Sequence, residues 1–288
     1  MSEIRATGPD ALTLATELLQ RARRADPLAG VWEAADVQWW WRRARASDEI
    51  EQLFWTDDEG PVAGILLTTW GEDTWQCDPL VVRAVGPSLD AVWARALEEI
   101  DAHASGRVVE VLVREDDADL IGLAETSGFV AGPGGGTLWM DLADRPDVKP
   151  PAAGFTLVDR GVRADTPHPM HQRNGDAVEE RLGQVTLYDP ELDLAIEAPD
   201  GSMAAYSLYW FDPVTKVGLV EPVRVEDEYH RRGLATAMLT AGIDRLAAKG
   251  AERVKVGFSS PVARDLYQGI GFRLTSTDKT YVRPGSAS

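Results

Sequence analysis

Cysteine and long apolar runs are scarce in this chain of 288 residues. Its single cysteine, Cys77, excludes an internal disulfide and a cysteine-based metal cluster, and we expect it to be buried and unreactive. No apolar run reaches the roughly 18 residues that a membrane-spanning helix needs. The N-terminus also lacks the charged start and apolar run of a signal peptide. We therefore expect a soluble, cytoplasmic protein.

Basic residues are outnumbered, with 29 Lys and Arg against 47 Asp and Glu, which gives a formal net charge of −18. A protein that binds nucleic acid needs a basic surface to neutralise the phosphates, and a protein that binds an anionic membrane needs a basic surface as well. The charge balance therefore argues against a nucleic-acid or membrane partner. A small cationic partner, such as an amine, is electrostatically easier to recruit.

Lysine is absent from residues 1–145, which hold 12 arginines and 27 acids for a net charge of −15. Residues 146–288 carry only −3, and nine of the ten tryptophans precede residue 145. A segment with three prolines in eight residues, 144–151, favours extended backbone between these unlike halves. We predict a first domain at 1–145, a linker at 146–151 and a second domain at 152–288.

Both halves show the same order of strand and helix patterns, which predicts an α+β unit that occurs twice. Each unit is expected to be a mixed central β-sheet flanked by α-helices. The first half is predicted to contain strands at 50–56, 62–67 and 108–113 and helices at 89–104, capped by Ser88, and at 120–127. The second half is predicted to contain strands at 154–158, 192–197, 204–210, 217–225, 253–258 and near Tyr281, and helices at 177–184, 234–249 and 261–268.

One segment of the second half carries the chemistry: a strand leads through a short turn into a helix that starts after Arg231, Arg232 and Gly233. Free amides at a helix N-terminus, together with the helix dipole, form an anion site. Gly233 and Ala235 leave the backbone accessible to phosphate oxygens. On these residues alone, an ordinary helix start with solvated arginines stays an equal alternative.

The later run Ala263-Arg264-Asp265-Leu266-Tyr267, followed by Gly271-Phe272, changes that balance. Together the two motifs resemble the GNAT superfamily of acyl-CoA-dependent N-acyltransferases, and the resemblance covers residues 154–283. It implies acetyl-CoA as co-substrate and no metal. The amides of Arg231, Arg232, Gly233, Leu234, Ala235 and Thr236 would hold its pyrophosphate, and the strand backbone at Val223, Arg224 and Val225 would pair with the pantetheine arm.

The resemblance also assigns catalytic roles. Tyr267 occupies the position of the general acid that protonates the leaving thiolate; the alternative is a packed aromatic. Glu221 would act as base, directly or through water, or would only attract a cationic substrate. Two positions depart from the family pattern, because His230 replaces Arg or Gln and Ser260 replaces Asn, although a serine can still hydrogen-bond a pantetheine amide. The expected activity is acetyl transfer to a primary amine by direct attack.

The first half lacks the Arg-x-x-Gly-x-Gly/Ala element at its corresponding junction, and Ala124 stands where Tyr267 would be. We interpret it as a degenerate GNAT-like domain that provides scaffold and an acidic acceptor surface. The chain then resembles tandem GNAT proteins, an arrangement also found in mycothiol synthase. A catalytically weak CoA-binding protein with a regulatory or scaffolding role is the alternative. Small amines, aminoglycosides, amino-sugar thiols and protein N-termini all stay open as acceptors, and both monomer and homodimer stay open.

Three further signals receive structural interpretations. The glycine run 132–136 leads into a strand rather than a helix, so we expect a flexible turn and no phosphate loop. His168 and His171 are separated by proline and lack a third ligand, so we expect no metal and place them on a mobile acceptor-side loop. The Trp39-Trp40-Trp41 run is expected to pack against a helix or a domain interface.

Overall fold

The computed structural model describes residues 1–71 and 73–285, which form two compact units. Unit 1 comprises Met1–Val37, Ala44–Gly136 and the chain from Ser276 onward. Unit 2 comprises Gln38–Arg43 and Thr137–Thr275. Each unit therefore includes segments from both sides of the predicted linker at 146–151.

Unit 1 is built on a mixed sheet with the strand order β1-β2-β3-β4-β5-β12-β6. The first four strands pair antiparallel, β4 and β5 pair parallel, and β5 pairs antiparallel with β12. The strands are β1 (Ser2–Ala6), β2 (Gln52–Asp57), β3 (Gly60–Trp70), β4 (Thr74–Val81), β5 (Val108–Arg114), β6 (Val130–Asp141) and β12 (Arg273–Arg283), of which the last two contribute residues to both units. The helices are α1 (Gly8–Ala25), α3 (Leu89–His103) and α4 (Ala118–Thr126), with a short 3-10 turn η1 (Ala46–Glu49).

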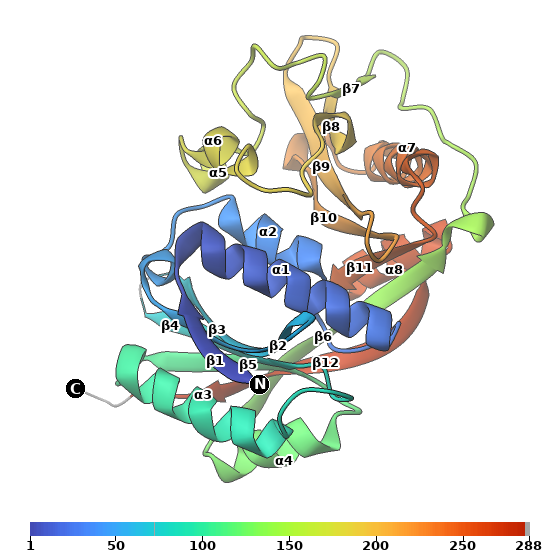
Figure 1. Ribbon diagram of the computed structural model, residues 1–288. Helices are drawn as coiled ribbons and strands as arrows, with labels where there is room; N and C mark the ends of the chain where they lie inside the picture. Colours follow the sequence, from blue (N-terminus) through green and yellow to red (C-terminus); the bar gives the residue numbers. More distant parts are fainter. Residues whose placement is uncertain (72, 286–288) are drawn as a thin grey trace. The chain divides into compact units, whose positions relative to one another are not determined.

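Helices cover both faces of the unit 1 sheet, with α1 on one side and α3 and α4 on the other (Figure 1). The apolar stripe Val92, Ala96 and Ile100 of α3 is fully buried, as its spacing predicts. The Ser88 hydroxyl accepts a hydrogen bond from the Ala91 amide at 3.3 Å, which confirms the predicted N-cap. Cys77 is buried as expected, and burial raises the pKa of its thiol.

Unit 2 repeats the architecture with the strand order β6-β11-β10-β9-β8-β7. Its other strands are β7 (Thr156–Asp159), β8 (Asp193–Glu197), β9 (Met203–Asp212), β10 (Val217–Val225) and β11 (Arg253–Phe258). Its helices are α5 (His171–Asn174), α6 (Val178–Leu182), α7 (Leu234–Lys249) and α8 (Pro261–Ile270), with the end of α2 (Ala34–Trp41) and 3-10 turns η2 (Leu142–Asp144), η3 (Pro190–Leu192) and η4 (Asp227–Tyr229). The predicted bounds of β10, α7 and β11 are confirmed to the residue, and so is the predicted α+β class.

The core of unit 2 lies between α7 and the sheet. At Gly242, in the middle of α7, an added Cβ would lie 2.1 Å from Cζ of Tyr209 on β9. The Tyr209 hydroxyl donates to the Met238 carbonyl of the same helix at 2.8 Å. A glycine at this position therefore lets the helix lie directly on the tyrosine ring.

The glycine run 132–136 corrects a sequence prediction, because these residues belong to strand β6 and form no flexible turn. A Cβ on Gly134 would lie 2.4 Å from the Asp278 carbonyl oxygen of β12. The two backbones thus approach too closely for a side chain at that position. Glycine here reflects close strand packing rather than a bend.

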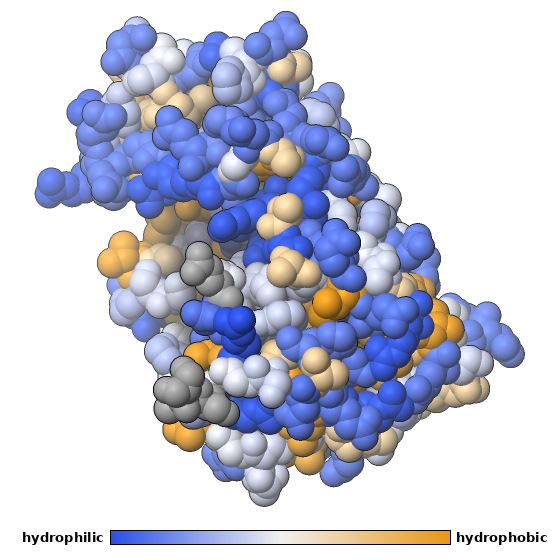
Figure 2. Space-filling model, turned by 90° about the vertical axis from the view of Figure 1, so that its left-hand side faces the viewer, coloured by the Kyte–Doolittle hydropathy of each residue, from blue (hydrophilic) through white to orange (hydrophobic). Residues whose placement is uncertain are grey.

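Hydrophilic side chains cover most of the face shown in Figure 2, with apolar residues in scattered patches. This surface agrees with the strongly acidic composition. Among the residues that the structure describes, none of the helices has the length and apolar character required to cross a bilayer.

Candidate active site

Two parallel strands separate in unit 2 and open a gap in the sheet. β10 pairs with β11 only from Val217 to Val220, where the partners run from Arg253 to Val256. Beyond that point β10 keeps its antiparallel partner β9, with Val223, Arg224 and Val225 opposite Ser207, Tyr206 and Ala205. The edge of β10 that carries these three residues toward β11 is therefore available to an extended ligand.

The N-terminus of α7 follows this strand closely. Gly233 is the N-cap residue in the left-handed conformation, with φ of +73°, and Arg231 shares it with φ of +60°. Because glycine has no side chain, it leaves the first amides of α7, at Leu234, Ala235 and Thr236, without a side-chain cap. Amides aligned with the helix dipole attract an anion.

Cationic side chains border this helix start. Arg231 and Arg232 are exposed. The Arg232 guanidinium lies 5.8 Å from the centre of the Phe155 ring and 5.7 Å from that of Tyr229. Within the turn, His230 Nε2 lies 3.0 Å from the Val225 carbonyl oxygen, so this side chain interacts with the turn itself. His230, one of the two positions that depart from the expected pattern, therefore contributes a contact within the turn.

Tyr267 lies on α8, is 7% exposed and packs edge-on against Phe272 at 6.0 Å between ring centres. Burial raises the pKa of its phenol, and the negative charge of Glu221 raises it further. The structure thus brings the two predicted catalytic residues within electrostatic range of each other. The raised pKa keeps the phenol protonated at neutral pH, which is the state that a general acid requires before the transfer.

Glu221 occupies the position on β10 where the parallel pairing with β11 has just ended, and it is half-buried. Its backbone carbonyl accepts a hydrogen bond from Trp210 Nε1 at 2.8 Å. The hydroxyl of Ser207 likewise donates to the Pro222 carbonyl at 2.8 Å. These bonds from β9 hold the backbone at Glu221 and at the residue that follows it.

Ser260 is the N-cap of α8, and its hydroxyl accepts from the Ala263 amide at 3.3 Å. The same arrangement recurs in unit 1, where Asp117 caps α4 by accepting from the Leu120 amide at 3.2 Å. At the other ends of these helices, Phe272 N donates to the Tyr267 carbonyl at 3.1 Å and Phe129 N donates to the Ala124 carbonyl at 3.0 Å. Ala124 therefore holds the structural position of Tyr267, as the sequence comparison predicts.

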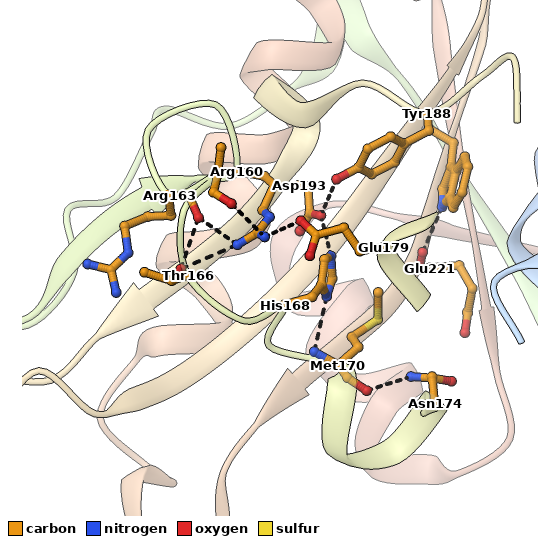
Figure 3. A network of polar contacts seen from close by, with 12 residues as sticks. Arg160, Arg163, Thr166, His168, Met170, Asn174, Glu179, Tyr188, Asp193 and Glu221 are labelled. Carbon is orange, nitrogen blue, oxygen red and sulfur yellow. Dashed lines mark hydrogen bonds and ion pairs between the residues drawn. The ribbon is translucent and has the colours of Figure 1, made fainter. Parts of the chain in front are cut away.

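A buried polar network, absent from the sequence prediction, anchors the chain between β7 and β8 (Figure 3). His168, only 3% exposed, accepts at Nδ1 from the Met170 amide at 3.1 Å, so Nε2 carries the proton. Nε2 then donates to Asp193 Oδ2 at 2.7 Å, and the Tyr188 hydroxyl donates to the same oxygen at 2.7 Å. The expectation of a mobile loop is wrong for His168.

Arg160 extends this network toward the start of the same segment (Figure 3). Its guanidinium donates to the Arg163 carbonyl at 2.6 Å, to the Ala164 carbonyl at 3.1 Å and to the Glu179 carboxylate. Sequence reasoning missed this anchor because its members are spread over more than thirty positions of the chain. The one signal available was the pair of histidines, of which His168 has its buried partner Asp193 on a separate strand.

The tryptophan run of α2 belongs to unit 2, where it packs as predicted. Trp39 lies 6.3 Å from Trp210 between ring centres, in an edge-on arrangement. Arg42 stacks over Trp39 at 3.6 Å and donates to Asn174 Oδ1 at 2.8 Å. Since Trp210 also holds the Glu221 carbonyl, residues 38–43 support the site from a distant part of the sequence.

Nowhere in residues 1–71 and 73–285 do three or more His, Cys, Asp or Glu side chains converge as metal ligands would. His168 is engaged with Asp193, and His171 pairs with Asp176 at 2.8 Å.

Comparison with known sequences finds similarity over part of the chain. Residues 164–272 match the acetyltransferase (GNAT) family. A mycothiol acetyltransferase from Clavibacter michiganensis subsp. michiganensis is 32% identical over 126 residues, which are 42% of this chain and 40% of that protein. The matched region thus spans about two fifths of this curated relative.

Solved structures match the fold over the whole length. The tandem GNAT protein from the clavulanic acid biosynthesis pathway has a TM-score of 0.66 and 16% identity, with 100% of this chain and 99% of that chain covered. A GCN5-related N-acetyltransferase from Sphaerobacter thermophilus has a TM-score of 0.62 and 18% identity, with 99% and 98% covered. At these identities the similarity establishes the fold.

Proposed function

We propose that this chain transfers the acetyl group of acetyl-CoA to a primary amine, because residues 164–272 match the acetyltransferase (GNAT) family and the whole chain has the fold of a tandem GNAT protein. We place the one active site in unit 2. The observation that carries the proposal is the position of Glu221, where β10 leaves β11, together with a buried Tyr267 on α8 whose phenol is within electrostatic range of that carboxylate.

The residues fit the co-substrate at three points. The start of α7, from Arg231 to Thr236, would hold the pyrophosphate through its uncapped amides. The open edge at Val223, Arg224 and Val225 would pair with the pantetheine amides. Ser260 keeps a hydroxyl proton to donate there, although its oxygen already caps α8.

The reaction follows from these positions. The amine nitrogen attacks the thioester carbonyl carbon, an amide C–N bond forms and the C–S bond breaks. Glu221 takes the proton released by the nitrogen, directly or through a water molecule, and Tyr267 gives its proton to the departing sulfur. Acetyl-CoA and the primary amine thus yield the N-acetylated amine and CoA, with the proton balance restored through solvent.

Acid–base assistance matters because an alkyl amine with a pKa near ~10.4 is neutral in only about one molecule in ~10³ at pH 7. Removal of that proton costs roughly 4–5 kcal/mol. A positioned acid or base typically contributes about 10²–10⁴-fold to the rate. The carboxylate of Glu221 on β10 and the buried phenol of Tyr267 on α8 would supply both functions.

The acceptor we propose is a small cationic amine. This rests on the acidic composition of the chain and on Glu221 at the gap, where a carboxylate attracts a cation before it accepts a proton. The curated relative of the acetyltransferase segment is a mycothiol acetyltransferase, which makes amino sugars a sensible first group in an acceptor panel.

The test is CoA release with acetyl-CoA and a panel of amines, followed by mass detection of the acetylated product. Tyr267→Phe is expected to lower kcat by about 10²-fold or more, with the KM for acetyl-CoA little changed, because the lost proton donor acts on the leaving sulfur. Tyr281→Phe removes a hydroxyl from a buried tyrosine of unit 1 and serves as the matched control. Equal turnover of Tyr267→Phe and the control would remove Tyr267 from the mechanism. Saturable acetyl-CoA binding without transfer to any amine would instead favour a regulatory or scaffolding role.

A further inference from the structure

Unit 1 contains a cavity of about 620 Å³ that the proposed transfer does not use. It lies between α1, the ends of β4 and β5, and the start of α4. β4 and β5 pair only from Thr74 to Gln76, so the strands separate beyond this point as β10 and β11 do in unit 2. Much of the lining is apolar, with contributions that include Leu18, Leu80 and Leu112.

A single buried carboxylate, that of Asp78, lies on the wall of this cavity. It is 3% exposed, and its two oxygens accept from Trp32 Nε1 at 2.8 Å and Gln76 Nε2 at 2.7 Å. Both donors are neutral. Burial raises the pKa of Asp78 to about 6, and the carboxylate of Asp36 acts in the same direction. The carboxylate therefore lies beside an open volume in surroundings that favour a cation.

The arginines of the cavity wall are already engaged by carboxylates, so they present no anion-binding site. Asp26 adds a further carboxylate to the lining. The ion pairs are Arg23 with Glu33, at 3.0 Å between Nε and Oε2, Arg83 with Asp117 at 2.7 Å and Asp119 at 3.1 Å, and Arg114 with Asp116 at 2.6 Å.

Asp78 corresponds to Glu221 by position. Each is the fifth residue of the strand that separates from its parallel neighbour, and each is followed by proline. The other parts of the transfer site have no counterpart, because Ala124 replaces Tyr267 and the start of α3 is capped by its own Ser88. Unit 1 thus retains the acid and the gap but not the proton donor or the uncapped helix start.

We propose that unit 1 binds a primary-amine ligand with an apolar body in this cavity, through an ion pair with Asp78, and does not acetylate it. The apolar walls accept the body of the ligand, and the ammonium group supplies the positive charge next to the carboxylate. A cavity of this size suits an organic molecule of drug-like dimensions. Binding here needs no acetyl-CoA and is independent of the transfer proposed for unit 2.

Calorimetric titration of the full chain, without acetyl-CoA, tests this proposal. The probes are 4-phenylbutylamine and its neutral analogue 4-phenylbutan-1-ol. We expect the amine to bind at least about tenfold more tightly than the alcohol, because a hydrogen bond to a charged group is worth more than a neutral one. Asp78→Asn should lower the affinity for the amine by at least the same factor, whereas Glu221→Gln should leave the affinity of this site unchanged.

A second variant, Leu112→Trp, reduces the cavity volume and keeps Asp78; it should also abolish amine binding while thermal melts report an intact fold. Equal affinity for amine and alcohol, no amine binding at millimolar concentration, or binding that survives both unit 1 variants would each overturn the proposal. If only Glu221→Gln loses amine binding, the amine binds in unit 2 and the proposal fails. The same titration is carried out with CoA. If CoA binds and Leu112→Trp abolishes that binding, the cavity is a coenzyme site and the proposal also fails.

Discussion

Replacement of Gly233 by alanine tests whether the start of α7 binds the phosphates of acetyl-CoA. Gly233 has a φ of +73°, and an added Cβ would meet no atom within 4 Å. Gly250, at the other end of the same helix, has a φ of +100°, and its nearest neighbour would be Phe211 Cζ at 3.9 Å. The two glycines are therefore matched in strain and space but lie at opposite helix ends.

The expected stability cost is the same for both variants. A left-handed conformation costs a non-glycine residue about 1–2 kcal/mol. The loss of chain entropy in the unfolded state returns about 0.4–1 kcal/mol. The net destabilisation of about 0.5–1.5 kcal/mol corresponds to a decrease in Tm of a few degrees for a chain of this size.

The functional effect should distinguish them. A methyl group at Gly233 enters the open space through which phosphate oxygens reach the amides, and one or two charge-assisted hydrogen bonds of roughly 1.5–3 kcal/mol each are weakened. The KM for acetyl-CoA is therefore expected to rise about tenfold or more in Gly233→Ala and to stay unchanged in Gly250→Ala, with kcat at saturation similar in both. Thermal melts and steady-state kinetics measure the two effects. A rise in KM of equal size in both variants, or none in Gly233→Ala, would refute the anion site.

Two further predictions concern stability. Gly242→Ala should destabilise unit 2 by about 1–3 kcal/mol through overpacking against Tyr209, whereas Gly122→Ala in α4, where an added Cβ meets open space, should raise Tm slightly. A Gly242→Ala variant that melts no lower than the wild type, or a Gly122→Ala variant that melts clearly lower, would contradict the packing argument. The pKa of Asp78 is raised to about 6 from 3.8, so the folded state favours the protonated acid. The contribution of this group to the free energy of unfolding is therefore complete below about pH 4 and falls by about 3 kcal/mol as the pH rises through 6. Urea unfolding across this range should show the fall in the wild type but not in Asp78→Asn, and equal pH dependence of the two proteins would refute the prediction.

Local patterns in the sequence were sufficient to predict the strands and the helix that form the candidate site. The bounds of β10, α7 and β11 follow from short-range periodicity and from Gly233 and Gly250 at the helix ends, and the structure reproduces them. The correspondence of Ala124 to Tyr267 was likewise readable, because a glycine and a phenylalanine follow at the same spacing in both halves. Such signals lie within a few residues of one another, so they do not depend on tertiary contacts between distant parts of the chain.

Glycine was the residue that sequence reasoning judged wrongly. The run 132–136 has the composition of a turn, yet it forms part of β6 because the backbone of β12 approaches Gly134 more closely than any side chain permits. The reason lies in a strand more than a hundred residues later in the chain. Composition alone does not distinguish a glycine needed for bending from one needed for close approach.

The sequence by itself predicted an α+β unit that occurs twice, the proposed phosphate-binding motif and the proposed acid and base, because each of these patterns lies in residues close together in the chain. The tertiary structure decided what surrounds them. It brought residues 38–43 onto Trp210, joined His168 to Asp193 and Tyr188, and put Asp78 on the wall of a cavity. These contacts join residues that are far apart in sequence, and burial in the folded chain is what gives their charges and hydrogen bonds their strength.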